Sequence, residues 1–145
     1  MLIPLAEGLK SLNVQMSQLL IWIKNQPVIS RKDYLLQHEL IFVGWRNKHH
    51  FRKSKDKSVI FCPKPQKSQF HPTQKPVSLI RRLILNSTNK NEWVYDPFGG
   101  SGTTLIAAEQ TKRRCLMIEI DPDYCRTIIQ RYEKLSSTKA KKYER

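Results

Sequence analysis

The sequence DPFGGSGTT at residues 96–104 contains the strongest fold signal in this chain. A short apolar run, WVY at 93–95, precedes it, and the helix-forming run LIAA at 105–108 follows it. This order predicts a strand, a glycine bend and a helix start, an arrangement that directs backbone N–H groups at an anionic ligand. A second apolar run, LMI at 116–118, ends on Glu119, where a carboxylate can accept hydrogen bonds from a ribose.

The composition of the bend favours one kind of nucleotide-like ligand. Gly99, Gly100 and Gly102 permit positive φ angles and allow a ligand to approach the backbone. The bend lacks the lysine of a P-loop, and Leu105 stands where a dinucleotide-binding fold keeps its third glycine. Asp96 suits a cationic group better than a pyrophosphate. S-adenosylmethionine carries an amino group, a carboxylate and a ribose diol, and these groups match the acid, the bend and the second acid.

The first half of the chain is predicted to contain one helix and two strands. Apolar residues at helical spacing (Leu5, Leu9, Leu12, Met16 and Leu19) predict an amphipathic helix over 4–17. Two runs rich in strand formers, LLIWIK at 19–24 and ELIFVGW at 39–45, predict strands. Residues 62–76 contain four prolines and are expected to form an extended loop.

The second half alternates helix, strand, helix, strand and helix. Pro76 suits a first helical position, a second helix is predicted at about 103–111, and Asp121 with Pro122 predicts the cap and start of a third. The apolar faces expected to be buried are Val77, Ile80, Leu83 and Ile84 in the first of these helices and Tyr124, Ile128, Ile129, Tyr132 and Leu135 in the third. This order predicts an α/β fold with a mostly parallel sheet covered by helices.

The charge of the chain suggests a polyanionic partner. The 145 residues include 26 Lys and Arg against 12 Asp and Glu, a formal net charge of +14. Such an excess favours nucleic acid, and a solubilising surface or a basic tail is the alternative. No apolar run approaches the ~20 residues of a membrane span, so no membrane partner is expected. Cys62, Cys115 and Cys125 make no CxxC pair, which favours reduced thiols in a cytoplasmic protein.

Three motifs of the second half resemble those of a known family. HPTQKPVSLIRRLI at 71–84, VYDPFGGSGTT at 94–104 and IEIDPDYC at 118–125 resemble consecutive motifs of the DNA amino-methyltransferases. They resemble most closely the bacterial and phage group whose cofactor-binding half is C-terminal. LLIWIKN at 19–25 and DYLLQHELIFVGW at 33–45 resemble the paired strands that precede the target-recognition segment of that group. The resemblance implies a Rossmann-like fold and methyl transfer from S-adenosylmethionine to adenine N6 or cytosine N4.

The resemblance also implies roles for residues around the bend. Asp96 is expected near the amino group of the methionine moiety, and Glu119 is expected at the ribose hydroxyls. Asp121 would cap the next helix and border the adenine pocket, or serve as a cap alone. The full set expected to bind S-adenosylmethionine is Thr73, Lys75, Asp96, Phe98, Gly99, Gly100, Ser101, Gly102, Thr103, Thr104, Glu119 and Asp121.

A basic segment at residues 46–57 lies where the resemblance places target recognition. Its cations can pair with DNA phosphates and its aromatic rings can stack on bases, so double-stranded DNA is the expected partner. A solvated basic loop is the alternative. No ligand cluster accompanies His49 and His50, so no metal site is expected. The residues expected to contact DNA are Arg46, Lys48, Phe51, Arg52, Lys53, Lys55 and Lys57.

The catalytic motif of these enzymes has no match in the chain. That motif is an Asp, Asn or Ser followed by Pro-Pro and an aromatic residue, and the sequence contains no Pro-Pro. Residues 96–98 and 121–124 lack the second proline. No catalytic residue is therefore assigned. Because the motif lies upstream in this group, residues 1–145 are expected to form one incomplete domain with recognition at 46–70, cofactor binding at 71–135 and a basic tail at 136–145.

The strand that carries the catalytic motif is then expected to be missing from the sheet. Its loss predicts an unpaired strand edge and an uncovered apolar face. Two explanations are open at this point. The chain is one half of a split enzyme, completed by a separate polypeptide, or it is a truncated prophage product that binds the cofactor without activity.

Overall fold

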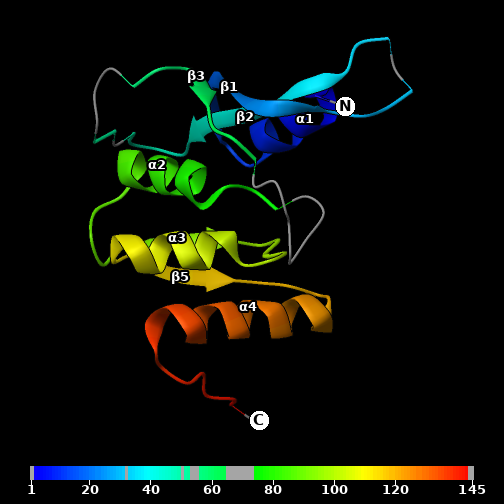
Figure 1. Ribbon diagram of the computed structural model, residues 1–145. Helices are drawn as coiled ribbons and strands as arrows, with labels where there is room; N and C mark the ends of the chain where they lie inside the picture. The colour runs from blue at the N-terminus through cyan, green and yellow to red at the C-terminus, as the bar shows by residue number, and fades with distance from the viewer. Residues whose placement is uncertain (1, 32, 50, 53–55, 65–73, 144–145) are drawn as a thin grey trace. The chain divides into compact units, whose positions relative to one another are not determined.

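The structure of the chain is a computed structural model that describes residues 2–31, 33–49, 51–52, 56–64 and 74–143 (Figure 1). The chain divides into two compact units, Met1–Pro63 and Lys64–Arg145. Each unit is α/β in composition, as predicted from the sequence. Each is described by itself below.

The first unit consists of one helix and a three-stranded sheet. Helix α1 (Leu2–Ser11) leads into β1 (Gln15–Val28), which pairs antiparallel with β2 (Leu36–Trp45). The short strand β3 (Val59–Phe61) pairs in parallel with the other edge of β1, so the order is β2-β1-β3. The predicted pair of strands is confirmed, and both strands are longer than predicted. Strand β3 was not predicted because three residues are too few for a periodic signal.

Helix α1 is shorter than the predicted helix over 4–17. Asn13 adopts a left-handed conformation with φ 56°, and the backbone N–H of Val14 donates to the carbonyl of Leu9 at 2.9 Å. A left-handed residue directly after a helix satisfies its last carbonyls and ends it. Met16, which was predicted to lie in the helix, therefore lies in β1, and so does Leu19, the first residue of the predicted strand at 19–24.

Two side-chain contacts connect the strands of the first unit. The indole Nε1 of Trp22 on β1 donates to the carbonyl of Cys62, directly after β3, at 2.7 Å. The ammonium of Lys24 on β1 lies 2.9 Å from a carboxylate oxygen of Glu39 on β2. Both side chains on β1 are buried, and each finds its polar partner on a neighbouring strand or just beyond it.

The second unit follows the predicted order of elements. It contains α2 (Val77–Ser87), β4 (Trp93–Asp96), α3 (Thr103–Thr111), β5 (Arg114–Met117) and α4 (Pro122–Ser136). Strands β4 and β5 pair in parallel, as predicted for a strand–helix–strand unit.

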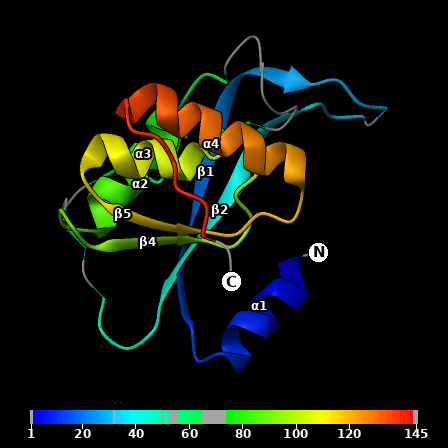
Figure 2. The same ribbon diagram turned by 90° about the horizontal axis from the view of Figure 1, so that it is seen from below.

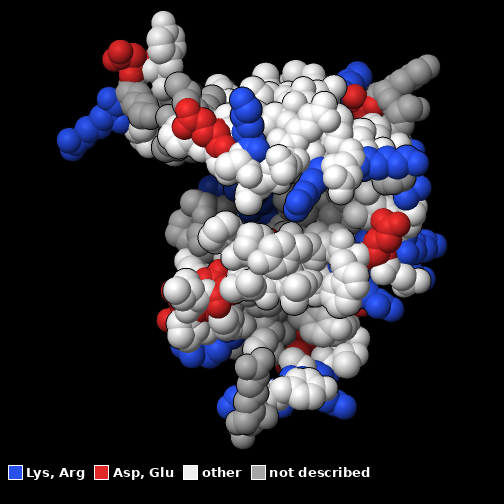
Figure 3. All heavy atoms as spheres, turned by 180° about the vertical axis from the view of Figure 1, so that it is seen from behind, with Lys and Arg blue, Asp and Glu red and all other residues white. Residues whose placement is uncertain are grey.

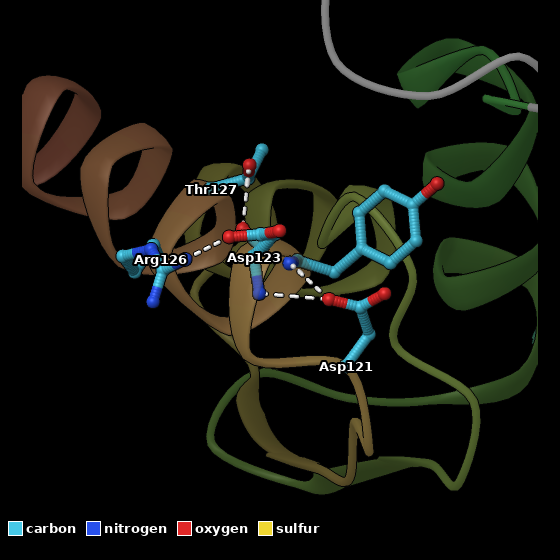
Figure 4. A network of polar contacts seen from close by, with 5 residues as sticks. Asp121, Asp123, Arg126 and Thr127 are labelled. Atoms are coloured by element: carbon cyan, nitrogen blue, oxygen red, sulfur yellow. Dashed lines mark hydrogen bonds and ion pairs between the residues drawn. The ribbon is translucent and has the colours of Figure 1, made fainter.

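The starts of two helices test the capping predictions. Pro76 is the N-cap of α2 rather than its first residue, because its ψ of 135° is extended and the helix begins at Val77. Asp121 is the N-cap of α4, as predicted, and Pro122 is the first helical residue. One carboxylate oxygen of Asp121 accepts from the backbone N–H groups of Asp123 at 2.7 Å and Tyr124 at 3.4 Å (Figure 4).

The core of the second unit lies between the helices and one face of the β4–β5 pair. Ile84 of α2 packs with Ala107 and Ala108 of α3, both fully buried. Val94 of β4 and Cys115 of β5 pack against this cluster from the sheet. Figure 2 shows α2, α3 and α4 on the same side of the two strands. The small side chains of α3 allow the helix to approach both the sheet and α2 closely.

The other face of the β4–β5 pair is not covered by the described residues of the second unit. We call it the open face and define it as Trp93, Tyr95, Leu116 and Ile118, whose exposed fractions are 63%, 58%, 56% and 53%. Parallel sheets are normally covered on both faces. The predicted uncovered apolar face is therefore present.

Helix α4 buries less of its apolar stripe than predicted. Tyr124, Ile128 and Tyr132 are half-buried, but Ile129 and Leu135 are exposed, so the prediction was wrong for these two residues. The reason is that α4 packs along a narrow line against α3, at which Ile128 lies beside Gly102. Ile129 points about a quarter-turn away from that line, and Leu135 lies two turns beyond Ile128, near the end of the helix, so both remain exposed.

Gly102 is a position at which a side chain should destabilise this unit. Its φ is +79°, and an added Cβ would lie 3.0 Å from Cγ1 of Ile128. Gly102→Ala is expected to lower the free energy of unfolding by about 1–2 kcal/mol, the cost of a left-handed residue other than glycine. Thermal and urea denaturation followed by circular dichroism measures the effect.

The control for this prediction is Gly8→Ala, in the middle of α1, where an added Cβ meets nothing within 4 Å. That change is expected to stabilise the helix by about 0.5–1 kcal/mol. A Gly102→Ala protein as stable as the wild type would contradict the packing described for the bend.

Candidate functional site

The glycine bend is hydrogen-bonded to the end of β5. The N–H of Ile118, directly after β5, donates to the carbonyl of Asp96, the last residue of β4, at 2.9 Å. The N–H of Gly99 in turn donates to the carbonyl of Ile118 at 2.8 Å. One carboxylate oxygen of Asp96 accepts from the N–H of Phe98 at 3.1 Å. The bend therefore has a defined shape before any ligand binds, and the second carboxylate oxygen of Asp96 is not used in that turn.

Gly99 is required for a reason other than its φ angle. A Cβ at this position would lie 2.7 Å from both Cγ and Sδ of Met117 on β5, closer than any real contact. The sequence predicted that glycine here permits a positive φ angle and the approach of a ligand, whereas Gly99 has no positive φ and the space beside Met117 is the constraint. The absence of a side chain lets the bend lie directly on the end of β5.

The carboxylate of Glu119 accepts hydrogen bonds from three backbone N–H groups of the described residues. Oε2 accepts from Gly100 at 2.6 Å, and Oε1 accepts from Ile120 at 2.8 Å and Asp121 at 2.9 Å. These bonds, that of Asp121 first and that of Gly100 second, lower the pKa of Glu119 from its ordinary value. Glu119 is therefore ionised at neutral pH, and its carboxylate connects the bend to the start of α4.

The first turn of α3 opens beside the bend. Its N-cap, Gly102, provides no side-chain cap for the turn, so its N–H groups are available to an anion. The hydroxyl of Thr103 donates to the carbonyl of Lys75 at 3.3 Å and lies 3.5 Å from the hydroxyl of buried Ser101. These contacts hold the segment before α2 against the helix start.

These elements surround one cavity of about 670 Å³ within the second unit. This volume is typical of sites for small molecules and cofactors. Ten of the twelve residues predicted to bind the cofactor line it, while Gly102 caps α3 and Thr73 lies outside the described residues. The lining residues are Gln74, Lys75, Ile80, Tyr95, Asp96, Phe98, Gly99, Gly100, Ser101, Thr103, Thr104, Glu119, Ile120, Asp121 and Tyr124.

Several lining residues were not predicted. Tyr124 was assigned to the buried face of α4, but it faces the cavity, and Ile120 contributes an almost fully exposed apolar side chain. Arg131 of α4, which is outside the lining set, was also not predicted: it donates to the carbonyl of the lining residue Ser101, and burial lowers its pKa. No spacing rule identifies such an arginine, because its partner is a backbone carbonyl 30 residues away in the sequence.

The neighbouring thiol of Cys115 has no nucleophilic character at neutral pH. Burial, with a smaller contribution from the charge of Asp96, raises the pKa of Cys115 to about 11. Such a thiol stays protonated and inert. Its side chain is partly buried and packs against the cluster of Ile84, Ala107 and Ala108.

The residues predicted to contact DNA belong to the first unit. Arg46, Lys48, Phe51, Arg52 and Lys57 are exposed, while Lys53 and Lys55 lie outside the described residues. Figure 3 shows Lys and Arg side chains spread over one face of the molecule, with Asp and Glu side chains between them.

The described part of the chain contains neither a candidate metal site nor a candidate membrane span. Among residues 2–31, 33–49, 51–52, 56–64 and 74–143, no group of three or more His, Cys, Asp or Glu side chains could hold a metal ion. None of the helices found there is long and apolar enough to cross a membrane.

Comparison with solved structures identifies the class of protein to which this fold belongs. The crystal structure of the M1.HpyAVI–SAM complex matches with a TM-score of 0.76 and 29% identity, over 90% of this chain and 68% of that chain. The cytosine-N4-specific PvuII DNA methyltransferase matches with a TM-score of 0.70 and 17% identity, over 92% of this chain and 59% of that chain, which shows the fold alone. The fold is the Rossmann-like fold of the S-adenosylmethionine-dependent methyltransferases, present here in part.

Comparison of sequences gives the family. The profile of the N6_N4_Mtase family, described as DNA methylase, matches residues 4–131, so the chain belongs to this family and the predicted resemblance is confirmed. Type II methyltransferase M2.DpnII of Streptococcus pneumoniae is 41% identical over 68 residues, which are 47% of this chain and 25% of that protein. DNA adenine methyltransferase YhdJ of Escherichia coli K12 is 43% identical over 63 residues, which are 43% of this chain and 21% of that protein. The aligned segment thus spans about a quarter of these relatives.

The hydrogen bonds of Glu119 predict a pH-dependent contribution to stability. Because the pKa of Glu119 is lower in the folded state than its ordinary 4.5, its charge stabilises the fold above pH 4.5, and this contribution is lost as the pH falls through the lowered folded value. Glu119→Gln is therefore expected to lower the Tm at neutral pH, with a difference from wild type that narrows below pH 4.5.

Thermal denaturation of both proteins across this pH range tests the prediction. Glu109→Gln, on the exposed side of α3, is the control and is expected to leave the Tm unchanged at every pH. A deficit in Glu119→Gln that stays constant into strong acid would show that shape rather than charge is responsible.

Proposed function

We propose that this chain binds S-adenosylmethionine in the cavity around Glu119 and forms the cofactor-binding and DNA-contacting part of a DNA amino-methyltransferase. The observation that carries the proposal is the cavity itself. It places two carboxylates, those of Asp96 and Glu119, on either side of a glycine bend and an uncapped helix start. Membership of the DNA methylase family supports it.

The groups around the cavity are complementary to the groups of the cofactor. The unused oxygen of Asp96 is available to the amino group of the methionine moiety. The first turn of α3, with Lys75 beside it, suits the carboxylate. Oε2 of Glu119 accepts one backbone N–H and keeps capacity for a ribose hydroxyl donor. The exposed apolar side chains of Phe98 and Ile120 suit the faces of the adenine.

The reaction that follows is a direct displacement at the methyl carbon of the sulfonium. The exocyclic amine of adenine or cytosine attacks that carbon, the carbon–sulfur bond breaks, and the amine loses a proton to give the methylated base and S-adenosylhomocysteine. The residues of this chain contribute by holding the donor in place, which favours reaction through orientation. The exposed cations Arg46, Lys48, Arg52 and Lys57 supply phosphate contacts with double-stranded DNA in the cytoplasm.

The proposed pocket predicts a specific pattern of affinity loss. Removal of a hydrogen-bond partner of a charged group costs about 1.5–3 kcal/mol. Glu119→Ala and Asp96→Ala are therefore each expected to weaken S-adenosylmethionine binding about 10-fold or more in isothermal titration calorimetry. Glu109→Ala, an acid of α3 outside the cavity, should bind like the wild type. Unchanged affinity in both pocket variants would contradict the assignment.

The open face supports a second proposal, that a separate polypeptide completes the sheet and supplies the catalytic motif. Tyr95 and Leu116 are paired in register at the centre of this face, and both are more than half exposed. The guanidinium of Arg114 lies 5.6 Å from the ring centroid of Trp93, and the other three residues of the face, Tyr95, Leu116 and Ile118, have no such cation over them among the described residues. An apolar face on a parallel sheet favours coverage by further polypeptide.

Methyl transfer to DNA tests this second proposal. The chain alone is expected to transfer no methyl group, and addition of the polypeptide encoded by the adjacent upstream reading frame is expected to produce transfer. Leu116→Lys should abolish the gain because it places a charge on the open face. Ile129→Lys, at an exposed apolar position on α4, should leave it intact. Methyl transfer by the pure single chain would overturn the proposal.

A further inference from the structure

Three aromatic rings form a continuous stack at the end of β2. The ring centroids of Trp45 and His49 lie 3.9 Å apart with an angle of 21° between the planes. The centroids of His49 and Phe51 lie 6.0 Å apart at 25°. We call these three residues the aromatic ladder. They come from the seven consecutive positions 45–51, so their alignment is a local property of the chain.

The backbone explains why the rings meet. Trp45 is the last residue of β2 and pairs with Gln15 of β1, so the first ring is fixed by the sheet. Asn47 has a left-handed φ of 62°, which turns the chain directly after the strand. The turn returns His49 to the face of Trp45, and Phe51 follows as the outer ring. The ladder is therefore ordered by the sheet in the absence of a ligand.

The outer end of the ladder is open and positively charged. Phe51 is 45% exposed, while Trp45 at the inner end is half-buried. Arg46, Lys48 and Arg52, in the same short segment, are exposed, and residues 45–52 include no Asp or Glu. An exposed aromatic ring in a basic segment suits a nucleic-acid base, whose π-face stacks on the ring while the adjacent phosphates meet the cations. An apolar protein surface would instead have to desolvate these cations.

We propose that the aromatic ladder stacks an unpaired DNA base on the ring of Phe51. The proposal rests on the proposed function, which makes DNA the polyanion. A base inside a duplex has a neighbour on each of its faces and cannot stack on Phe51, whereas a base that has left the helix can. Enzymes that modify a base must take it out of the stack. The ladder thus provides a site at which a base displaced from the duplex is held.

The test is equilibrium binding of the full chain to two fluorescein-labelled duplexes, one fully paired and one carrying a single bulged adenine. The wild type is expected to bind the bulged duplex more tightly. Stacking on an aromatic side chain contributes about 1–3 kcal/mol per base, so Phe51→Leu is expected to lose roughly 5- to 150-fold on the bulged duplex and little on the paired one. Phe51→Tyr keeps a ring and should keep the preference.

A charge variant separates stacking from electrostatics. Lys48→Gln is expected to weaken both duplexes equally and to flatten the dependence of affinity on salt. Equal affinities of Phe51→Leu and the wild type for the bulged duplex would overturn the proposal. Equal losses on both duplexes, or a loss in Phe51→Tyr as large as in Phe51→Leu, would overturn it as well.

Titration of the same proteins with S-adenosylmethionine distinguishes failure of this proposal from failure of the proposed function. A Phe51→Leu protein that binds S-adenosylmethionine normally and keeps the preference for the bulged duplex refutes the ladder alone. A wild type that prefers the bulged duplex but binds no S-adenosylmethionine supports the ladder and refutes the assignment of the cavity.

Discussion

The carboxylate of Glu119 is the interaction on which the candidate site depends. It accepts the N–H of Gly100 in the bend and those of Ile120 and Asp121 before α4. Two segments that lie 19 residues apart in the sequence are thereby held together after the carboxyl ends of the parallel strands β4 and β5. The same hydrogen bonds keep the carboxylate ionised, so the group that shapes the cavity also presents a fixed negative charge to it.

Preorganisation of the donor site contrasts with the exposed apolar surface on the open face of the sheet. The bend has its shape without a ligand, because Gly99 lies against Met117 and Thr103 holds the carbonyl of Lys75. The open face of the same strands carries Tyr95 and Leu116 exposed. The second unit therefore has a preformed cavity beside the glycine bend, while the open face of its two strands is apolar and favours burial by further polypeptide.

Much of this could be predicted from the sequence, because local signals specify it. The glycine bend, the cap at Asp121 and the alternation of helices and strands each depend on neighbouring residues, and all were confirmed. The failures have tertiary causes. Asn13 ends α1 early through a backbone conformation that a periodic pattern does not encode, and Ile129 is exposed because α4 contacts α3 along a narrow line. The contact of Arg131 with Ser101 depends on the packing of α4, and the stack of Trp45, His49 and Phe51 depends on a turn at Asn47.

Binding of S-adenosylmethionine in the cavity beside Glu119 is measured most directly through the amide resonances around that cavity. In ¹H–¹⁵N spectra of the full chain titrated with S-adenosylmethionine, the amides of Gly100 and Asp121, both bonded to Glu119, are expected to shift and to saturate together. The amide of Gly8 in α1 should not move. Resonances of Gly100 and Asp121 that stay unchanged at saturating cofactor, or that move no more than that of Gly8, would contradict the account.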